Sequence, residues 1–212
     1  EERLTFDVQT QIASRMGYAE RAGASGVERF MKHYYIVAKD VGDLTRIFCA
    51  AIEAENMSKP IIRLPRLRRS RDLMGFQVDR DRLTVADENQ FADDPVALIR
   101  LFYVAHNEGL DIHPHALRLV TQNLKRIDKT LRADPEANRM FVEMATSIDV
   151  PEVVLTRMNE AGVFGKFLRD FGRVVGQTQH DMYHVYTVDE HTIQAIGLLA
   201  KIERGELKKE HP

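Results

Sequence analysis

The stretch VERFMKHYYIVAKDVGDLTRIFCAAIEAEN, residues 27–56, is the longest periodic segment of this sequence. Apolar residues recur along it at steps of three and four: Val27, Phe30, Met31, Tyr34, Val37, Ala38, Val41, Leu44, Phe48, Ala51 and Ile52. This spacing predicts one helix of about eight turns with a continuous apolar stripe. We expect the helix to form the spine of a helical bundle, with its charged side facing solvent.

A shorter amphipathic helix is predicted before it, at residues 2–16, because four apolar residues lie one helical turn apart: Leu4, Val8, Ile12 and Met16. Gly17 ends this helix, and the Gly-Ala-Ser-Gly sequence at 23–26 predicts a flexible connection. A phosphate-binding loop would need a Lys-Ser/Thr pair after these glycines. That pair is missing, so we interpret the segment as a linker.

Residues 76–85 have a period of two instead. Phe76, Val78, Leu83 and Val85 alternate around Asp79-Arg80-Asp81, which predicts a short β-hairpin. An Asp-x-Asp pair also binds two metals in nucleotidyltransferases, but those enzymes need a Gly-Ser turn shortly upstream, and none precedes this pair. Paired acids are common at turns for turn chemistry alone, so we favour that interpretation.

The rest of the chain is predicted to be helical. Asp94-Pro95 and Asp134-Pro135 each offer an N-cap followed by proline, and Pro114 and Pro151 predict two more helix starts. A last helix is predicted at 189–206, with five residues on its buried side: Ile193, Ile196, Leu199, Ala200 and Ile202. The fold class is therefore mainly α, a multi-helix bundle with one small β-hairpin at about 76–85, and a domain boundary is expected near 165–170.

Composition narrows the class of protein further. The chain has 212 residues, 44% of them hydrophobic and 29% charged, with a net charge of −2, which is typical of a globular protein. No global charge points to nucleic acid or an acidic membrane, and no apolar run has the length of a membrane span.

The single cysteine, Cys49, fits a reducing compartment and lies in an apolar helical pattern, so we expect it to be buried. Cytoplasmic is the expected location, and the start at Glu1 without Met suggests a piece of a longer protein.

Residues 59–71, KPIIRLPRLRRSR, hold six basic side chains and two prolines. The prolines argue against a continuous helix. The run could contact phosphates or an acidic partner, with Arg63, Arg66, Arg68 and Arg69 as candidate contacts. A basic connector on the surface is the favoured interpretation, because aromatic side chains for stacking on nucleic acid are absent here.

A histidine cluster lies at 171–191, FGRVVGQTQHDMYHVYTVDEH. His180 and His184 are four apart, so on a helix they could chelate a metal together. His180-Asp181 is also the signature pair of HD-type phosphohydrolases, although the neighbours Gln177, Thr178 and Gln179 do not form the apolar helix that precedes this pair in those enzymes. Surface histidines with ordinary hydrogen bonds are the favoured interpretation. His191 instead lies in the first turn of a predicted helix with an apolar face. This is the position at which those hydrolases carry their first metal ligand.

Three stretches resemble a known family: residues 27–48, the lead-in FGRVVGQ at 171–177, and DMYHVYTVDEHTI at 181–193. They are similar to the bifunctional uridylyltransferase/uridylyl-removing enzyme of the PII signalling protein (GlnD family), over essentially the whole chain. The resemblance implies a multi-domain bacterial enzyme of nitrogen regulation. A nucleotidyltransferase domain would add UMP from UTP to PII, a hydrolase domain of the HD type would remove it, and ACT domains would sense glutamine.

On this resemblance the chain is an internal fragment. Residues 1–168 would be a helical domain associated with the nucleotidyltransferase core, and residues 169–212 the opening helices of the hydrolase domain. Of the catalytic positions only His191 carries over, as a first metal ligand whose partners are missing. The whole enzyme would use Mg²⁺ or Mn²⁺, while the fragment alone is expected to bind none and to be inactive, because a lone imidazole cannot hold such ions.

Two alternatives remain open. The first is a self-contained small metallohydrolase whose site combines His180, Asp181, His184 and His191. The second is a non-catalytic interaction module that binds an acidic partner through the basic run at 59–71. Such binding would weaken steeply as the salt concentration rises.

Overall fold

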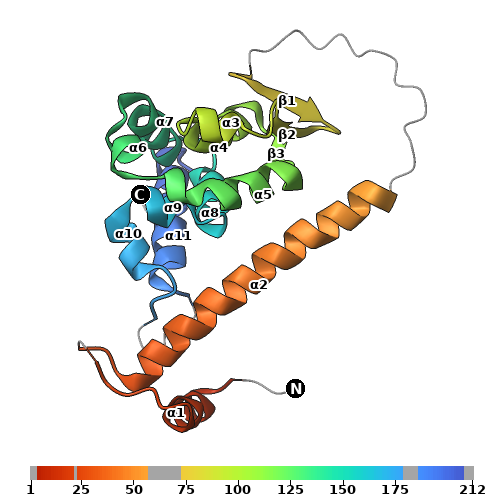
Figure 1. Cartoon of the computed structure of the whole chain (residues 1–212). Helices are drawn as coiled ribbons and strands as arrows, with labels where there is room; N and C mark the ends of the chain where they lie inside the picture. Colours follow the sequence, from red (N-terminus) through yellow and green to blue (C-terminus); the bar gives the residue numbers. More distant parts are fainter. Residues whose placement is uncertain (1–3, 22, 57–72, 179–185, 208–212) are drawn as a thin grey trace.

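The structure is a computed structural model of the 212-residue chain and describes residues 4–21, 23–56, 73–178 and 186–207. Helices dominate this part of the chain, as the sequence predicts, and a small sheet lies at one side (Figure 1). The helices are α1 (Phe6–Arg15), α2 (Gly26–Asn56), α3 (Gln90–Asp93), α4 (Ala97–Glu108), α5 (Pro114–Asn123), α6 (Lys129–Ala133), α7 (Pro135–Ala145), α8 (Pro151–Glu160), α9 (Val163–Phe167), α10 (Arg169–Val174) and α11 (Val188–Glu203), with a 3₁₀ turn at Leu124–Arg126. The strands are β1 (Phe76–Asp79), β2 (Arg82–Val85) and β3 (Asp111–Ile112). None of the described helices is both long and apolar enough to cross a membrane.

The main hydrophobic core is built around α4. Leu98, Leu101 and Phe102 of this helix are completely buried, and α4 packs against α7 and α8. Their spacing of three and four residues places them on one face of the helix. Each large side chain buried in this way stabilises the fold by about 1.5–3 kcal/mol, so α4 is the central element of the bundle.

The β-hairpin at 76–85 is confirmed. β1 and β2 pair antiparallel, with Phe76 opposite Val85, and Arg80 and Asp81 form the turn with φ angles of 47° and 62°. Positive φ at both central residues is the geometry of a two-residue hairpin turn. A third strand, β3, pairs parallel to β2 and was not predicted, because two residues carry no readable period.

Helix starts follow the proline signals closely. α7 begins at Pro135, and Asp134 Oδ1 accepts a hydrogen bond from the Ala137 N–H at 2.8 Å. α5 and α8 begin at Pro114 and Pro151, as predicted. α4 begins two residues later than expected, at Ala97, because a tight turn precedes it in which the Ala97 N–H donates to the Asp94 carbonyl.

The long helix α2 is confirmed, but its role as the spine of the bundle is wrong. Figure 1 shows α2 running alongside the compact group of helices, not through its centre. Val41, Leu44 and Phe48 are 57–65% exposed, and Cys49, which was expected to be buried, is exposed as well. Among the described residues, the apolar stripe of α2 is covered mainly where α1 packs on its first turns.

The last helix is also more exposed than predicted. α11 packs against α8, and Ile193 and Ala200 are buried, but Leu199 is 64% exposed and Ile202 40% exposed. The close approach occurs at Gly197, where an added Cβ would lie 2.7 Å from Glu152 Cδ. The apolar face of α11 is therefore covered only in part.

The α4 core generates a stability prediction. Replacing Leu101, which is completely buried, with Ala should lower the free energy of unfolding by roughly 2–5 kcal/mol, because it removes packing and leaves a cavity. Leu199→Ala is the matched control on the exposed face of α11 and should change it by no more than roughly 0.5 kcal/mol. Urea unfolding followed by circular dichroism measures both values. Equal losses for the two variants would contradict the assignment of the core.

Candidate functional site

His191 lies in the first turn of α11, where the sequence places it. Thr187 is the N-cap in an extended conformation, and the His191 N–H donates to the Thr187 carbonyl at 2.9 Å, the first hydrogen bond of the helix. The His191 side chain is exposed to solvent. The backbone position of this imidazole is therefore set by the helix start, while its ring nitrogens remain accessible.

Asp189, two residues earlier, is a buried carboxylate with only 2% exposure. Asn159 of α8 donates to its Oδ2 through Nδ2 at 2.7 Å, and the Gly176 N–H donates to its Oδ1 at 3.0 Å. A further side-chain hydrogen bond joins it to Thr187. These contacts fix the beginning of α11 to α8 and to the loop after α10. We call this set of residues, Asn159, Gly176, Thr187 and Asp189, the Asp189 junction.

The electrostatics of the junction favour the ionised carboxylate. Burial raises the pKa of the Asp189 carboxyl, but hydrogen bonds from Asn159, Thr187 and Gly176 and the positive charge of Lys39 outweigh it. The pKa of Asp189 therefore lies below its usual value. Because this carboxylate is buried and accepts these bonds, its role in the described structure is to position the start of α11.

Helix α2 touches the same junction from its other side. Lys32 Nζ donates to the Arg173 carbonyl at 2.8 Å, and a Cβ added to Gly176 would lie 3.0 Å from Ile36 Cγ1. Gly176 has φ +67°, so this close approach and its backbone conformation both favour glycine. The pKa of Tyr35 is raised by burial, by Tyr34 and by the nearby charge of Glu190. Three elements, α2, α8 and α11, thus meet at the Asp189 junction, next to the start of the helix that carries His191.

The sequence pattern did not reveal that Asp189 is buried. Its position does offer a signal, because it lies four residues before Ile193 and so on the apolar side of the helix. An acidic residue on the buried face of a helix indicates a partnered carboxylate. Its partner Asn159 could not be found from sequence, because it comes from a separate helix 30 residues away.

The other candidate residues lie outside the described part of the chain. These are Arg63, Arg66, Arg68 and Arg69 of the basic run, and His180, Asp181 and His184 of the histidine cluster. The structure therefore does not bring them together with His191 or separate them from it, and the hypotheses built on them stay predictions. Within the residues that are described, no three His, Cys, Asp or Glu side chains gather as a metal site.

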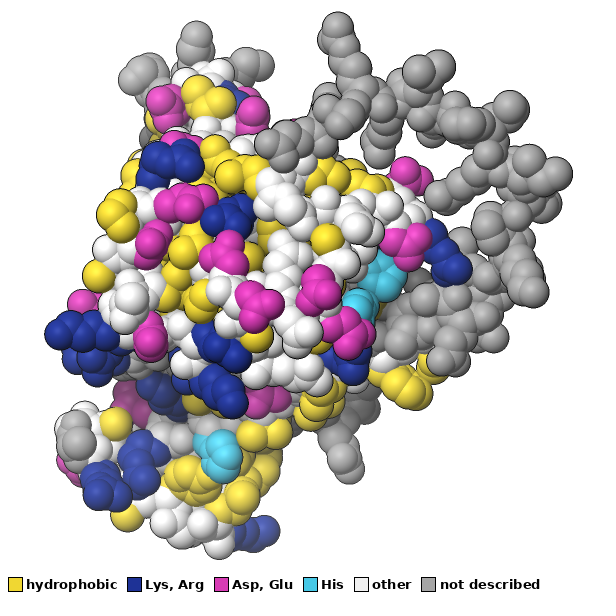
Figure 2. Space-filling view, turned by 45° about the horizontal axis from the view of Figure 1, so that its top comes forward, with side chains coloured by type: hydrophobic (Ala, Val, Ile, Leu, Met, Phe, Trp, Pro, Cys, Tyr) yellow, Lys and Arg dark blue, Asp and Glu magenta, His cyan; other side chains and the backbone are white. Residues whose placement is uncertain are grey.

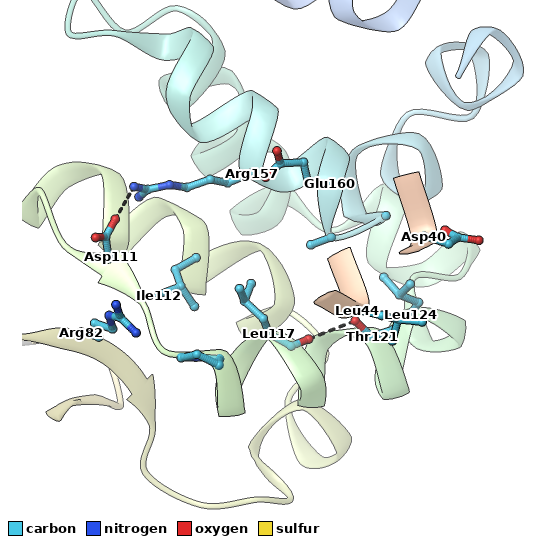
Figure 3. Close-up of a pocket in the computed structure, with 13 residues that line it drawn as sticks. Asp40, Leu44, Arg82, Asp111, Ile112, Leu117, Thr121, Leu124, Arg157 and Glu160 are labelled. Carbon is cyan, nitrogen blue, oxygen red and sulfur yellow. Dashed lines mark hydrogen bonds and ion pairs between the residues drawn. The ribbon is translucent and has the colours of Figure 1, made fainter. Parts of the chain in front are cut away.

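A cavity of about 590 Å³ lies between α2 and the group formed by β3, α5 and α8 (Figure 3). Ile112, Leu117 and Leu124 give it an aliphatic wall, and Leu44 of α2 faces it. Arg157 at its edge is paired with Asp111, so this guanidinium is already neutralised. Arg82, Asp40 and Glu160 also line the cavity, so it combines an aliphatic wall with charges of both signs. Sequence reasoning missed it because its residues come from separate segments.

Histidines also lie beside the hairpin. His113 Nε2 is 3.8 Å from Asp79 Oδ2, and His115 Nε2 is 3.3 Å from Glu88 Oε1. Figure 2 shows histidine side chains bordered by acidic ones on one face, amid charges of both signs. His113 is also the N-cap of α5, where its Nδ1 accepts from the His115 N–H at 3.1 Å. This group caps a helix, which requires the neutral imidazole.

Comparisons with known proteins identify relatives of this chain. The model described as uridylyltransferase GlnD third domain matches residues 76–167, and the model described as GlnD PII-uridylyltransferase matches residues 1–49. A bifunctional uridylyltransferase/uridylyl-removing enzyme of Azospirillum brasilense is 60% identical over 215 residues, which is 100% of this chain and 23% of that protein. One of Rhodospirillum rubrum is 54% identical over 213 residues, again 100% of this chain and 23% of the relative. No solved structure matches the chain.

The chain belongs to the GlnD uridylyltransferase family, and the family resemblance seen in the sequence is confirmed. It spans 23% of the length of the curated relatives named above. The two family models match separate stretches: one ends within α2, and the other runs from β1 to α9.

The Asp189 junction generates a prediction about stability. Asp189→Asn should lower the free energy of unfolding by about 1–3 kcal/mol, because the new amide group would point a donor at Asn159 or Gly176, which are themselves donors. Glu190→Gln is the matched control, since Glu190 is the exposed neighbour on the same helix, and should change stability by no more than roughly 0.5 kcal/mol. Urea unfolding of the two variants tests this. A loss for Glu190→Gln as large as for Asp189→Asn would contradict it.

His113 generates a prediction about pH. Burial lowers the pKa of His113 below 6.5, and His115, Arg82 and Arg80 lower it further, against the opposing charge of Asp79. Between its folded pKa and 6.5 the unfolded chain binds more protons than the folded chain. The stability from neutral His113 is therefore present above about pH 6.5 and lost as the pH falls.

The test is His113→Asn, which keeps an N-cap acceptor but does not titrate in this range. Free energies of unfolding measured from pH 8 down to about 5 should fall less steeply in this variant than in the unsubstituted chain. Identical slopes would show that His113 does not titrate as described.

Proposed function

We propose that this chain is part of a bifunctional enzyme that transfers UMP from UTP to the PII protein and also removes it. The printed names of the relatives from Azospirillum brasilense and Rhodospirillum rubrum support this proposal. Because the chain spans 23% of their length, both activities are proposed for the whole protein and not for this segment alone.

Within that enzyme, residues 1–168 serve as a helical scaffold associated with the nucleotidyltransferase core. Residues 169–212 are the opening helices of an HD-type phosphohydrolase domain. The match of residues 1–49 to a PII-uridylyltransferase model supports the first part. The end of the third-domain match at residue 167 supports a boundary at that position.

The observation that carries the proposal is the placement of His191. Its exposed imidazole stands on a helix start that the buried Asp189 fixes to α8, as a metal ligand requires of its supporting residues. His191 can supply one nitrogen ligand to Mg²⁺ or Mn²⁺. Both are hard cations that require several oxygen ligands, so the rest of the site would come from other parts of the whole enzyme. When bound, such an ion activates water for attack on a phosphodiester.

The regulatory setting follows from the same family assignment. Glutamine sensed by ACT domains would set the balance between the two activities in nitrogen metabolism, in the bacterial cytoplasm. Membrane or nucleic-acid partners are not part of this proposal, since the net charge of −2 offers no field for an anionic partner.

The test is release of UMP from uridylylated PII in the presence of Mn²⁺. This chain alone should release none, while a chain extended through the following domain should release UMP. His191→Ala should reduce that release at least about 100-fold, because it removes a ligand that holds the activating ion. His115→Ala, a histidine substitution beside the hairpin, is the matched control and should leave the rate unchanged. Metal-dependent turnover by the short chain, abolished by His191→Ala, would overturn the proposal.

A further inference from the structure

One face of α2 carries a regular apolar series: Val27, Phe30, Tyr34, Val37, Val41, Leu44 and Phe48. We call this series the α2 seam. Its steps alternate between three and four residues, a mean period of 3.5, which is the spacing of a helix that packs lengthwise against another helix. From Phe30 to Phe48 the seam is about 27 Å long at the rise of an α-helix.

The first part of the seam is already a helix–helix contact. Val27 and Phe30 are buried in a small cluster with Ala13 of α1, and the ring of Tyr18 meets Phe30 edge-on with centroids 5.5 Å apart. Beyond Phe30 exposure rises along the helix, from 46% at Tyr34 to 65% at Phe48. The uncovered part of the seam is thus a direct continuation of the contact with α1.

The second half of the seam is not buried in the main core, although Leu44 faces the cavity beside α5. The residues of α2 that reach the Asp189 junction, Lys32 and Ile36, lie at other helical positions and contact Arg173 and Gly176. These contacts hold the opposite side of α2 against the segment after α10. Helix α5 also packs beside α2, and the cavity lined by Leu44, Leu117 and Leu124 lies between the two segments.

The composition beside the seam indicates several neighbouring helices, not one. Met31, Ala38 and Ile52 lie along one flank and widen the apolar face, as in a helix buried within a bundle. A two-stranded coil of identical chains would instead carry opposite charges on both flanks to select its partner. These flanks carry few charges, and Asp40 is one of them.

We propose that the α2 seam is covered by helices of the uridylyltransferase region of the longer protein, which complete a bundle with α1 and α2. The family match to residues 1–49 contains the whole seam and stands apart from the match at 76–167. The relatives also have 77% of their length outside this chain, since it covers 23% of them. This inference rests on the proposed function, that the chain is a segment of the bifunctional enzyme.

The inference gives α2 two roles in the enzyme. Its seam is an interior face of the uridylyltransferase region, and its opposite side contacts the Asp189 junction that holds His191. One rigid helix thus joins the region that adds UMP to the region that removes it.

The test is the alkylation rate of a single cysteine in the chain and in the full-length protein. With Cys49→Ser as background, Val41→Cys places a thiol on the seam, and Val142→Cys is the matched control on α7. Both valines are similarly exposed, at 57% and 55%. In the full-length protein the iodoacetamide rate at Val41→Cys, relative to Val142→Cys, should fall at least about tenfold, because the thiol then reacts only when the covering helices open.

Equal relative rates in both proteins would overturn the inference. Protection that appears in the short chain as its concentration rises, with a dimer in sedimentation, would also overturn it, because a second copy would then cover the seam. If a cysteine variant fails to fold, hydrogen exchange of the α2 amides at 37–48 in the unsubstituted proteins decides: slower exchange in the full-length protein supports the inference, and unchanged exchange overturns it.

UMP transfer and release are assayed on the same full-length protein. Protection of the seam without either activity would refute the proposed function and leave the docking surface in place. UMP transfer and release without protection of the seam would support the proposed function and refute the docking surface.

Discussion

A carboxylate taken out of water is stable in a folded protein only where hydrogen-bond donors and positive charge replace its hydration. Asp189 meets this condition through the Asn159 amide, the Gly176 N–H, Thr187 and the charge of Lys39. These groups come from α8, the loop after α10, the start of α11 and α2. A carboxylate buried here requires such donors, so the four segments that supply them meet at one place. The position of His191 is a consequence of this requirement.

Helix α2 relates the junction to the rest of the molecule. One side of it supports the loop at Gly176, where a larger residue would collide with Ile36. The other side carries apolar residues that the described residues leave largely exposed. A helix with this distribution is stabilised by packing partners on both sides. In the described part of this chain, the side that faces Gly176 has such partners, and most of the apolar side does not. This explains why a segment with the strongest periodicity is not the centre of the core.

Much of the fold could be predicted from local chemistry. Asp134-Pro135 specifies a capped helix start by itself, and the alternation around Arg80-Asp81 specifies a hairpin, because both signals depend only on neighbouring residues. The buried face of α4 follows equally from local spacing, because Leu98, Leu101 and Phe102 recur at steps of three and four residues. The family was recognisable from long stretches such as 27–48, which the comparisons confirm.

The predictions that were wrong concern burial, which depends on contacts with other segments. The periodicity of α2 and α11 shows that a face is apolar but not whether the chain itself covers it, so Cys49, Leu199 and Ile202 were wrongly expected to be buried. The burial of Asp189 depended on a residue 30 positions away. The claim that this carboxylate organises the region is tested most directly by hydrogen exchange at the Gly176 amide. If the Asp189 junction is formed, this amide should exchange as slowly as the amides in the middle of α4, although it lies in a loop. Exchange at the rate of an exposed loop would contradict the account.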